Sequence, residues 1–177
     1  MRLEAAGQVG TVVLGAEELV VVLAPTAVAA TAMGPGGVTP PPKKGSLTGR
    51  PAKPRAKDKD PENLRSVQRE NESARVLADN GYDIEQNPPS NSYNKNPDHK
   101  LNGEYADCYA PSTSDAYSII QRIAGKVNTR QASRIVLNLD DSQVALEVLK
   151  KEILENPIAG LKDIIVIRDG KIILFHP

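Results

Sequence analysis

Two aspartates near the middle of the chain are predicted to face each other across a β-hairpin. Asn102-Gly103 is a strong hairpin signal, because a type I′ turn requires positive φ at both central residues. With this two-residue loop, Asp98 lies directly opposite Asp107, with Cβ atoms about 5 Å apart. Carboxylates held so close share a proton or hold a cation. A solvent-facing hairpin whose carboxylates splay apart is the alternative at this stage.

A third carboxylate, Glu70, falls on the apolar stripe of a predicted helix over residues 61–80. Asp60 is suited to cap this helix, with Pro61 in its first turn. A glutamate on a buried face needs a partner, so Glu70 is a site candidate, whereas Glu72 points roughly the other way as a surface residue. The alternative is that Glu70 lies at the edge of the stripe and reaches solvent. The apolar residues of the stripe are Val67, Ala74, Leu77 and Ala78.

The next predicted helix, residues 115–127, offers two further candidates for the site: a lysine near its end and a phosphate-binding position at its start. Lys126 lies near the apolar stripe of this helix and could reach back to the carboxylates, or it simply suits a helix C-terminus. Ser112 and Thr113 precede the helix, where free backbone N–H groups can bind a phosphate. An ordinary cap formed by residues 111–114 explains the same pattern.

The remaining pattern predicts an α/β domain with a mixed central sheet flanked by helices. The order is helix, strand, hairpin, helix, strand, helix, hairpin. Asp140-Asp141-Ser142 is predicted to cap the third helix, and Asp169-Gly170 to form a second hairpin turn. The loop over 87–96 directly precedes Asp98 and is expected to border any site there, where it could act as a gate. The other predicted elements are strands over 82–86, 134–139, 163–168 and 171–175 and a helix over 143–155.

Composition narrows the classes of function. The formal net charge is zero, so no global electrostatic signal for nucleic acid or membrane exists, although a local basic surface can still serve a nuclease. The chain has no Trp and one Phe, which argues against a stacking platform as the main mode of binding single strands. The single cysteine, Cys108, excludes a disulfide framework within the chain and a multi-cysteine zinc site. We expect it to be a small buried residue on the hairpin face opposite the aspartates.

The first sixty residues differ from the rest. Residues 1–33 form an apolar stub, whose apolar run over 19–30 is too short to span a membrane. We interpret the stub as the remnant of a longer upstream region, and an export signal is the alternative. Residues 34–61 are rich in Pro, Gly and Lys and predict a flexible linker. We therefore predict a disordered N-terminal extension over 1–60 and a folded domain over 61–177, with no membrane integration expected for the latter.

Several short motifs in residues 62–177 resemble, in the same order, the C-terminal tRNA nuclease domain of contact-dependent growth inhibition toxins of the CdiA type. The resemblance does not cover the first sixty residues. The motifs are Arg69-Glu70-Asn71-Glu72-Ser73-Ala74, Leu77-Ala78-x-x-Gly81-Tyr82, Glu85-Gln86-Asn87-Pro88, Asn96-Pro97-Asp98, Asp107-Cys108-Tyr109-x-Pro111, Val136-Leu137-Asn138-Leu139-Asp140-Asp141 and Val166-Ile167-x-Asp169-Gly170-Lys171.

This resemblance implies a PD-(D/E)xK, restriction-endonuclease-like core. Asp98, after Pro97, would match the first acidic position, Asp107 the second, and Glu70 the carboxylate of the first helix. The lysine that the motif expects two residues after Asp107 is replaced by Tyr109. In this toxin group the following helix supplies the lysine, which points to Lys126, with Lys100 on the hairpin face of Asp98 as the alternative.

The resemblance also implies a toxin that enters a neighbouring bacterium, cleaves tRNA in its cytoplasm and is blocked in the producer by an immunity protein. We expect Mg²⁺ or another divalent cation to be held by Asp98, Asp107 and Glu70, with Lys126 orienting water or stabilising the transition state. Substrate contacts are expected from Lys100, Tyr109, Ser112 and Thr113. The alternatives are a DNA endonuclease with the same site and a non-catalytic binding module with a vestigial acidic site, which the missing lysine at position 109 favours.

Overall fold

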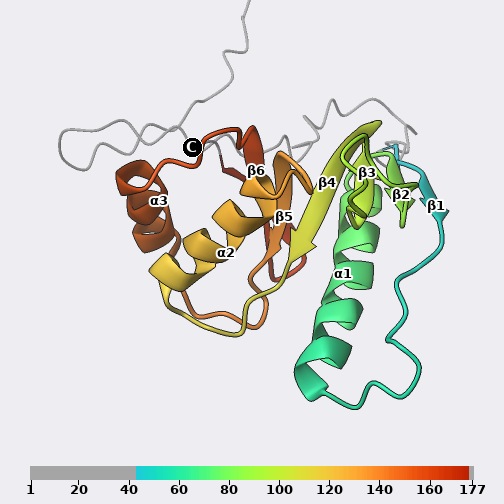
Figure 1. Ribbon diagram of the computed structural model, residues 1–177, viewed down its shortest axis with the longest axis horizontal. Helices are drawn as coiled ribbons and strands as arrows, with labels where there is room; N and C mark the ends of the chain where they lie inside the picture. Colours follow the sequence, from blue (N-terminus) through green and yellow to red (C-terminus); the bar gives the residue numbers. More distant parts are fainter. Residues whose placement is uncertain (1–42, 176–177) are drawn as a thin grey trace, which may run out of the picture.

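A mixed sheet runs through the part of the chain that the computed structural model describes, residues 43–175 (Figure 1). Within it, seven strands lie side by side in chain order. Strands β3 and β7 run antiparallel to their neighbours, and the other adjacent pairs are parallel. The strands are β1 (Leu47–Gly49), β2 (Ile84–Gln86), β3 (His99–Leu101), β4 (Glu104–Tyr109), β5 (Arg134–Asn138), β6 (Asp163–Arg168) and β7 (Lys171–Phe175), and the helices are α1 (Pro61–Asp79), α2 (Ala116–Asn128) and α3 (Leu146–Glu155).

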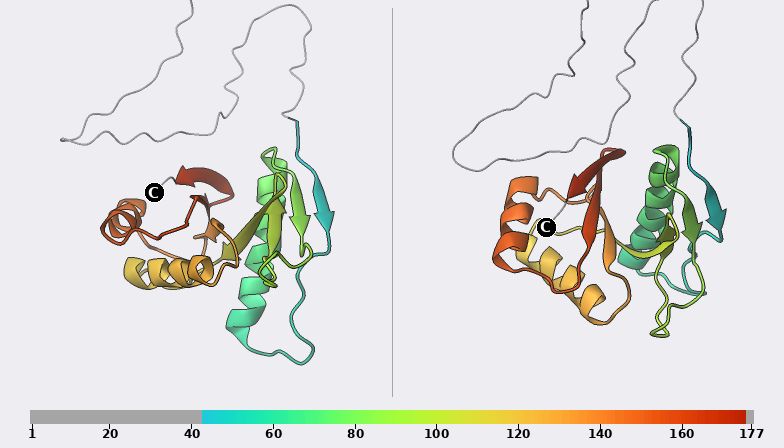
Figure 2. Two further views of the ribbon diagram at one scale, coloured as in Figure 1. Left: turned by 45° about the horizontal axis from the view of Figure 1, so that its top comes forward. Right: turned by 90° about the horizontal axis from the view of Figure 1, so that it is seen from above.

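Helix α1 covers one face of the sheet, and helices α2 and α3 cover the other, which Figures 1 and 2 show from three directions. The buried strands β5 and β6 therefore supply apolar residues to both faces, as near-continuous hydrophobic runs do in parallel sheets. The predicted α/β architecture and order of elements are confirmed. The core under α1 contains Ala74, Leu77, Ala78, Ile84, Leu101, Ala106, Cys108, Val136, Ile165 and Ile167. The core under α2 and α3 contains Ile119, Ile120, Ile123, Ile135, Leu137, Leu149, Ile153, Ile164 and Val166, among others.

Both predicted hairpin turns are confirmed. Asn102 and Gly103 have φ values of 50° and 84°, as a type I′ turn requires, and Lys100 pairs with Tyr105 in the predicted register. The turn between β6 and β7 is built in the same way, with φ of 53° at Asp169 and 66° at Gly170. The first of these turns sets the register that brings the two aspartates together.

The predicted linker and domain boundary need correction. Leu47–Gly49 forms β1 and pairs in parallel with β2, upstream of the predicted boundary at residue 60. Its side chains are exposed, so the strand is held by backbone hydrogen bonds that leave no apolar pattern to detect. A Cβ atom on Gly45 would come within 2.0 Å of the Tyr82 carbonyl oxygen, so a glycine is required for this close approach. The predicted stub and the start of the linker, residues 1–42, lie outside the described residues.

Two helix starts also differ from the sequence prediction. Helix α2 is capped by Asp115, which accepts a hydrogen bond from the Ser118 N–H (3.1 Å), and not by residues 111–114. Helix α3 begins at Leu146, after an N-cap residue, Ala145, that makes no side-chain capping bond. Asp140 and Asp141 are thus free for other contacts, described below. No helix in residues 43–175 has the length and apolar character needed to cross a membrane.

Candidate functional site

The hairpin places the two predicted aspartates side by side. Asp98 directly precedes β3, and its N–H donates to Asp107 Oδ1 (3.3 Å). The Cys108 N–H in turn donates to Asp98 Oδ2 (2.9 Å), so both carboxylates are tied to the opposite strand. Asp107 is fully buried, whereas Asp98 is half-buried. The predicted opposition of the two residues is confirmed, and splaying into solvent is excluded by these contacts.

Lys126 of α2 closes the site from the other face of the sheet. Its ammonium forms an ion pair with Asp107 Oδ2. Burial lowers the pKa of Lys126, but the adjacent Asp107 carboxylate outweighs this effect and raises it, so the ammonium stays charged. Gln131, in the turn after α2, donates from Nε2 to Asp107 Oδ1 (2.8 Å). Sequence reasoning missed Gln131, because it belongs to no periodic pattern or motif.

Glu70 of α1 completes an acidic cluster with the aspartates. Burial and the Asp107 carboxylate raise its pKa to about 7, although Lys126 acts in the opposite direction. Glu72 instead accepts hydrogen bonds from Arg69 (2.7 Å) and Gln68 (2.8 Å), as expected for a residue that points away from this cluster. We call Glu70, Asp98, Asp107 and Lys126 the Asp107 cluster.

The Asp107 cluster contains more negative than positive side chains. Burial, Asp107 and Glu70 raise the pKa of Asp98 to about 8. Three carboxylates thus face one ammonium, and the two raised pKa values reflect desolvation together with mutual repulsion. A cluster of this kind gains stability from an added proton or an added cation.

The four predicted substrate-binding residues make their contacts with residues outside the Asp107 cluster. The Lys100 ammonium lies 4.9 Å from the centre of the Tyr105 ring and 3.8 Å from Glu85, so it is Lys126 and not Lys100 that the structure brings to the aspartates. Tyr109 is half-buried against the core under α2 and α3. The Ser112 hydroxyl donates to Glu62 (3.4 Å), and Thr113 Oγ1 accepts from the Asp115 N–H (3.1 Å).

Cys108 and His99 lie on the α1 side of the hairpin. Cys108 is buried within the apolar core under α1, as predicted, and burial raises the pKa of its thiol. His99 is fully buried, both of its ring nitrogens lack a hydrogen-bond partner among the described residues, and burial lowers its pKa to about 4. A neutral thiol beside a neutral imidazole is not the activated pair that nucleophilic catalysis needs.

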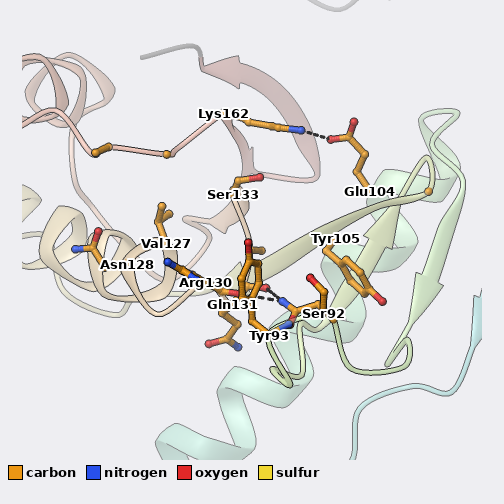
Figure 3. Close-up of a pocket in the computed structure, with 15 residues that line it drawn as sticks. Ser92, Tyr93, Glu104, Tyr105, Val127, Asn128, Arg130, Gln131, Ser133 and Lys162 are labelled. Carbon is orange, nitrogen blue, oxygen red and sulfur yellow. Dashed lines mark hydrogen bonds and ion pairs between the residues drawn. The ribbon is translucent and has the colours of Figure 1, made fainter.

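A groove of about 710 Å³ adjoins the Asp107 cluster, and Figure 3 shows its lining. Gln131 links the groove to the Asp107 cluster, because its side chain lines the groove and donates to Asp107. The loop before Asp98 forms one wall, so the prediction that this loop borders the site is confirmed. The polar and charged side chains of the lining come from Asn91, Ser92, Tyr93, Glu104, Tyr105, Asn128, Arg130, Gln131, Ser133 and Lys162.

The described residues hold no group of three or more His, Cys, Asp or Glu side chains placed to bind a metal ion as they stand. In the Asp107 cluster, Lys126 and Gln131 engage the two oxygens of Asp107, and the Cys108 N–H engages one oxygen of Asp98. The donor atoms are nevertheless carboxylate oxygens, which hard divalent cations prefer.

Comparison with known proteins places the chain in a family. Residues 95–172 match the family model of the contact-dependent growth inhibition CdiA C-terminal domain. The chain is 42% identical over 135 residues to the protein named tRNA nuclease CdiA-2 of Burkholderia pseudomallei (strain 1026b), and the match covers 75% of this chain and 4% of that protein. The chain therefore spans only a small part of that curated relative.

A solved structure agrees with this match over its whole length. The CdiA-CT/CdiI toxin and immunity complex from Burkholderia pseudomallei contains a chain that is 42% identical, with a TM-score of 0.69, and the match covers 75% of this chain and 100% of that one. At this identity and coverage, the chain belongs to the family of CdiA C-terminal domains of contact-dependent growth inhibition.

Proposed function

We propose that this chain is a contact-dependent growth inhibition toxin domain that cleaves tRNA in the cytoplasm of target bacteria, with a PD-(D/E)xK-type site. The observation that carries the proposal is the Asp107 cluster, in which a hairpin and a helix from each face of the sheet bring three carboxyl groups and the half-buried Lys126 together. The relative that is 42% identical to this chain is named a tRNA nuclease, and this name supplies the substrate class. An immunity protein is the proposed partner, because the matched structure is a toxin and immunity complex.

The acidic residues of the cluster would hold Mg²⁺ or another divalent cation through Asp98, Asp107 and Glu70. The excess of carboxylates over ammonium groups supports this proposal, since a cation would relieve the repulsion that raises the pKa values of Asp98 and Glu70. When bound, the ion would supply Lewis-acid stabilisation of the phosphate charge and an acidified water.

The protein's own groups would position the reaction. The Lys126 ammonium, held beside Asp107, can stabilise negative charge that develops on the phosphate oxygens. The Gln131 amide fixes one Asp107 oxygen and so keeps the carboxylate in one orientation. Tyr109, in the position where the motif expects lysine, is half-buried and packs on the core. In this proposal the lysine of the site therefore comes from α2, and not from the motif position that Tyr109 occupies.

The test uses the full chain, because β1 lies upstream of the predicted boundary and truncation at residue 61 would remove an edge strand. The protein is incubated with total bacterial tRNA and with plasmid DNA, in Mg²⁺ and in EDTA. The matched variants are Asp107→Asn and the control Asp169→Asn, since Asp169 is exposed in a turn that tolerates asparagine.

Defined tRNA fragments that require both the metal and Asp107 would support the proposal. Cleavage of DNA alone would favour the DNA endonuclease, and a folded chain that cleaves neither would favour the non-catalytic binding module. Metal binding has its own measurement: Mg²⁺ should raise the melting temperature of the wild-type chain relative to EDTA, and should do so less for Asp98→Asn. Equal shifts in both proteins would contradict the assigned ligand.

A further inference from the structure

The side chain of Asn91 joins the loop before Asp98 to the turn after α2, and Gln131 Nε2 adds a bond to the Asn96 carbonyl oxygen (3.4 Å). Asn91 Nδ2 donates to the carbonyl oxygens of Arg130 and Gln131 (2.9 Å each). Asn91 Oδ1 accepts from the backbone N–H groups of Tyr93 (3.0 Å) and Lys95 (3.1 Å). Two hydrogen bonds of this amide therefore hold one wall of the groove against the other, and the remaining two fix the shape of the loop itself.

These hydrogen bonds place the aromatic ring of Tyr93 next to the guanidinium of Arg130 at the rim of the groove. The Arg130 guanidinium carbon lies 4.7 Å from the centre of the Tyr93 ring. Tyr93 is 54% exposed, which leaves much of its side chain open to a ligand. Figure 3 shows the Tyr93 and Arg130 side chains next to each other, near Gln131. An exposed aromatic ring backed by a guanidinium is a stacking surface for a nucleobase.

The other residues of the groove offer the charge and the hydrogen-bonding groups that a bound nucleotide needs. The charged lining residues are Arg130, Lys162 and Glu104, and the Lys162 ammonium is already paired with Glu104 (3.2 Å). Arg130 is left as the cation available to a phosphate. The Asn128 and Gln131 amides can donate to and accept from base edges. The volume of about 710 Å³ lies within the range of ligand-binding pockets.

We propose that this groove binds an unpaired nucleotide of the RNA substrate directly beside the phosphodiester that is cleaved, with its base stacked on Tyr93. This proposal rests on the proposed function and adds which conformation the RNA substrate must have at the cleavage site. Its position follows from Gln131, which lines the groove and donates to Asp107. The RNA must therefore present an unstacked base next to the cleavage site, as in a single-stranded end, a loop or a locally opened stem.

The test compares Tyr93→Ala, Tyr93→Phe and Tyr117→Ala in the full chain. Tyr117 is similarly exposed (55%) but lies on α2 and does not line the groove. Loss of one base stack should lower kcat/KM for tRNA roughly tenfold or more in Tyr93→Ala. Tyr93→Phe keeps the ring and should stay within about twofold of wild type, as should Tyr117→Ala. Unchanged melting temperatures would exclude a change in loop structure as the cause.

Binding is measured separately, so that this proposal and the proposed function fail in different ways. Labelled tRNA is titrated against the full-length Asp107→Asn chain with and without Tyr93→Ala, and the second substitution should weaken binding roughly tenfold. Equal affinity, or equal cleavage by wild type and Tyr93→Ala, would overturn the nucleotide site. Loss of immunity-protein binding with intact tRNA binding would also overturn it and assign the groove to a protein partner. A wild-type chain that binds tRNA through Tyr93 without cleaving it would contradict only the proposed function.

Discussion

Adjacent residues of helix α1 enter two differently built acidic clusters. Glu70 joins the Asp107 cluster, whereas Arg69 binds Asp141 bidentately, with Nη2–Oδ1 of 2.6 Å and Nε–Oδ2 of 2.8 Å. Arg65 Nη1 adds a third bond to Asp141 (2.7 Å), and Asp140 lies 3.6 Å from Arg69. We call Arg65, Arg69, Asp140 and Asp141 the Asp141 cluster.

The two clusters differ in how directly their charges are paired. In the Asp141 cluster each guanidinium group bonds Asp141 directly, Arg65 and Arg69 also pair with Glu62 and Glu72, and hydrogen bonds from Arg69 and Arg65 lower the pKa of Asp141 to about 2. In the Asp107 cluster three carboxylates share one ammonium, and the pKa of Asp98 rises to about 8. Carboxylates that are bonded directly to guanidinium groups join α1 to the segment after β5, whereas carboxyl groups that raise one another's pKa around a single ammonium mark a place suited to a ligand or a reaction. The comparison therefore assigns structure to one cluster and chemistry to the other.

The largest expected contrast is in catalysis. Asp107→Asn removes a proposed metal ligand and the partner of Lys126, and should lower tRNA cleavage by roughly a thousandfold. Asp141→Asn changes a cluster that supports the fold and should leave kcat/KM within about threefold at temperatures where the variant is folded. Initial rates on tRNA, with circular dichroism to verify folding, measure both. The assignment of roles would be refuted if a folded Asp141→Asn chain were inactive.

The next contrast is in stability. The substitutions Asp141→Asn and Asp98→Asn should change the free energy of unfolding in opposite directions. Asp141→Asn weakens the hydrogen bonds to Arg65 and Arg69 and should lower the free energy of unfolding by about 2 kcal/mol. Asp98→Asn removes a carboxylate that Asp107 and Glu70 repel, while its amide oxygen can still accept from the Cys108 N–H. It should therefore raise the free energy of unfolding at pH 8 in EDTA.

Urea denaturation of both variants beside wild type measures this contrast, with Asp169→Asn as the matched control for the Asp-to-Asn change. A loss of stability in Asp98→Asn equal to that in Asp141→Asn would mean that the charges of the Asp107 cluster are paired as directly as those of the other. The Asp107 cluster would then be a structural one.

Much of the Asp107 cluster could be predicted from the sequence, because the hairpin register is set locally and the family resemblance directed attention to Glu70 and Lys126. Asn102-Gly103 fixes the register of the hairpin, so the opposition of Asp98 and Asp107 follows from counting. Helical periodicity likewise distinguishes Glu70 from Glu72, and it brings Lys126 to the apolar face of α2. These rules act within one element or one turn.

The Asp141 cluster and Gln131 could not be predicted in this way. Arg69 and Asp141 are 72 residues apart in the chain, and Gln131 and Asp107 are 24 apart, so only the packing of the elements brings them together. Asp140-Asp141-Ser142 was a reasonable capping sequence, but the arginines of α1 compete for Asp141 and the helix starts later. Strand β1 was missed because its side chains are exposed, so it leaves no alternating apolar pattern in the sequence.

The smallest expected effect is the pH dependence that separates the clusters. The pKa of Asp141 is lowered from 3.8 to about 2 in the folded chain, so its stabilising contribution is complete above the unfolded value and is lost as the pH falls from about 4 toward 2. Because the side chain is partly exposed to solvent, the loss should be about 1 kcal/mol. The difference in free energy of unfolding between wild type and Asp141→Asn should therefore shrink over this range, since protonated aspartate and asparagine interact alike with the arginines. Urea denaturation at pH 5, 4, 3 and 2 measures this difference. A difference that stays constant from pH 5 to 2 would show that the Asp141 carboxylate gains nothing from its arginines, and the two clusters would then not differ in the way proposed.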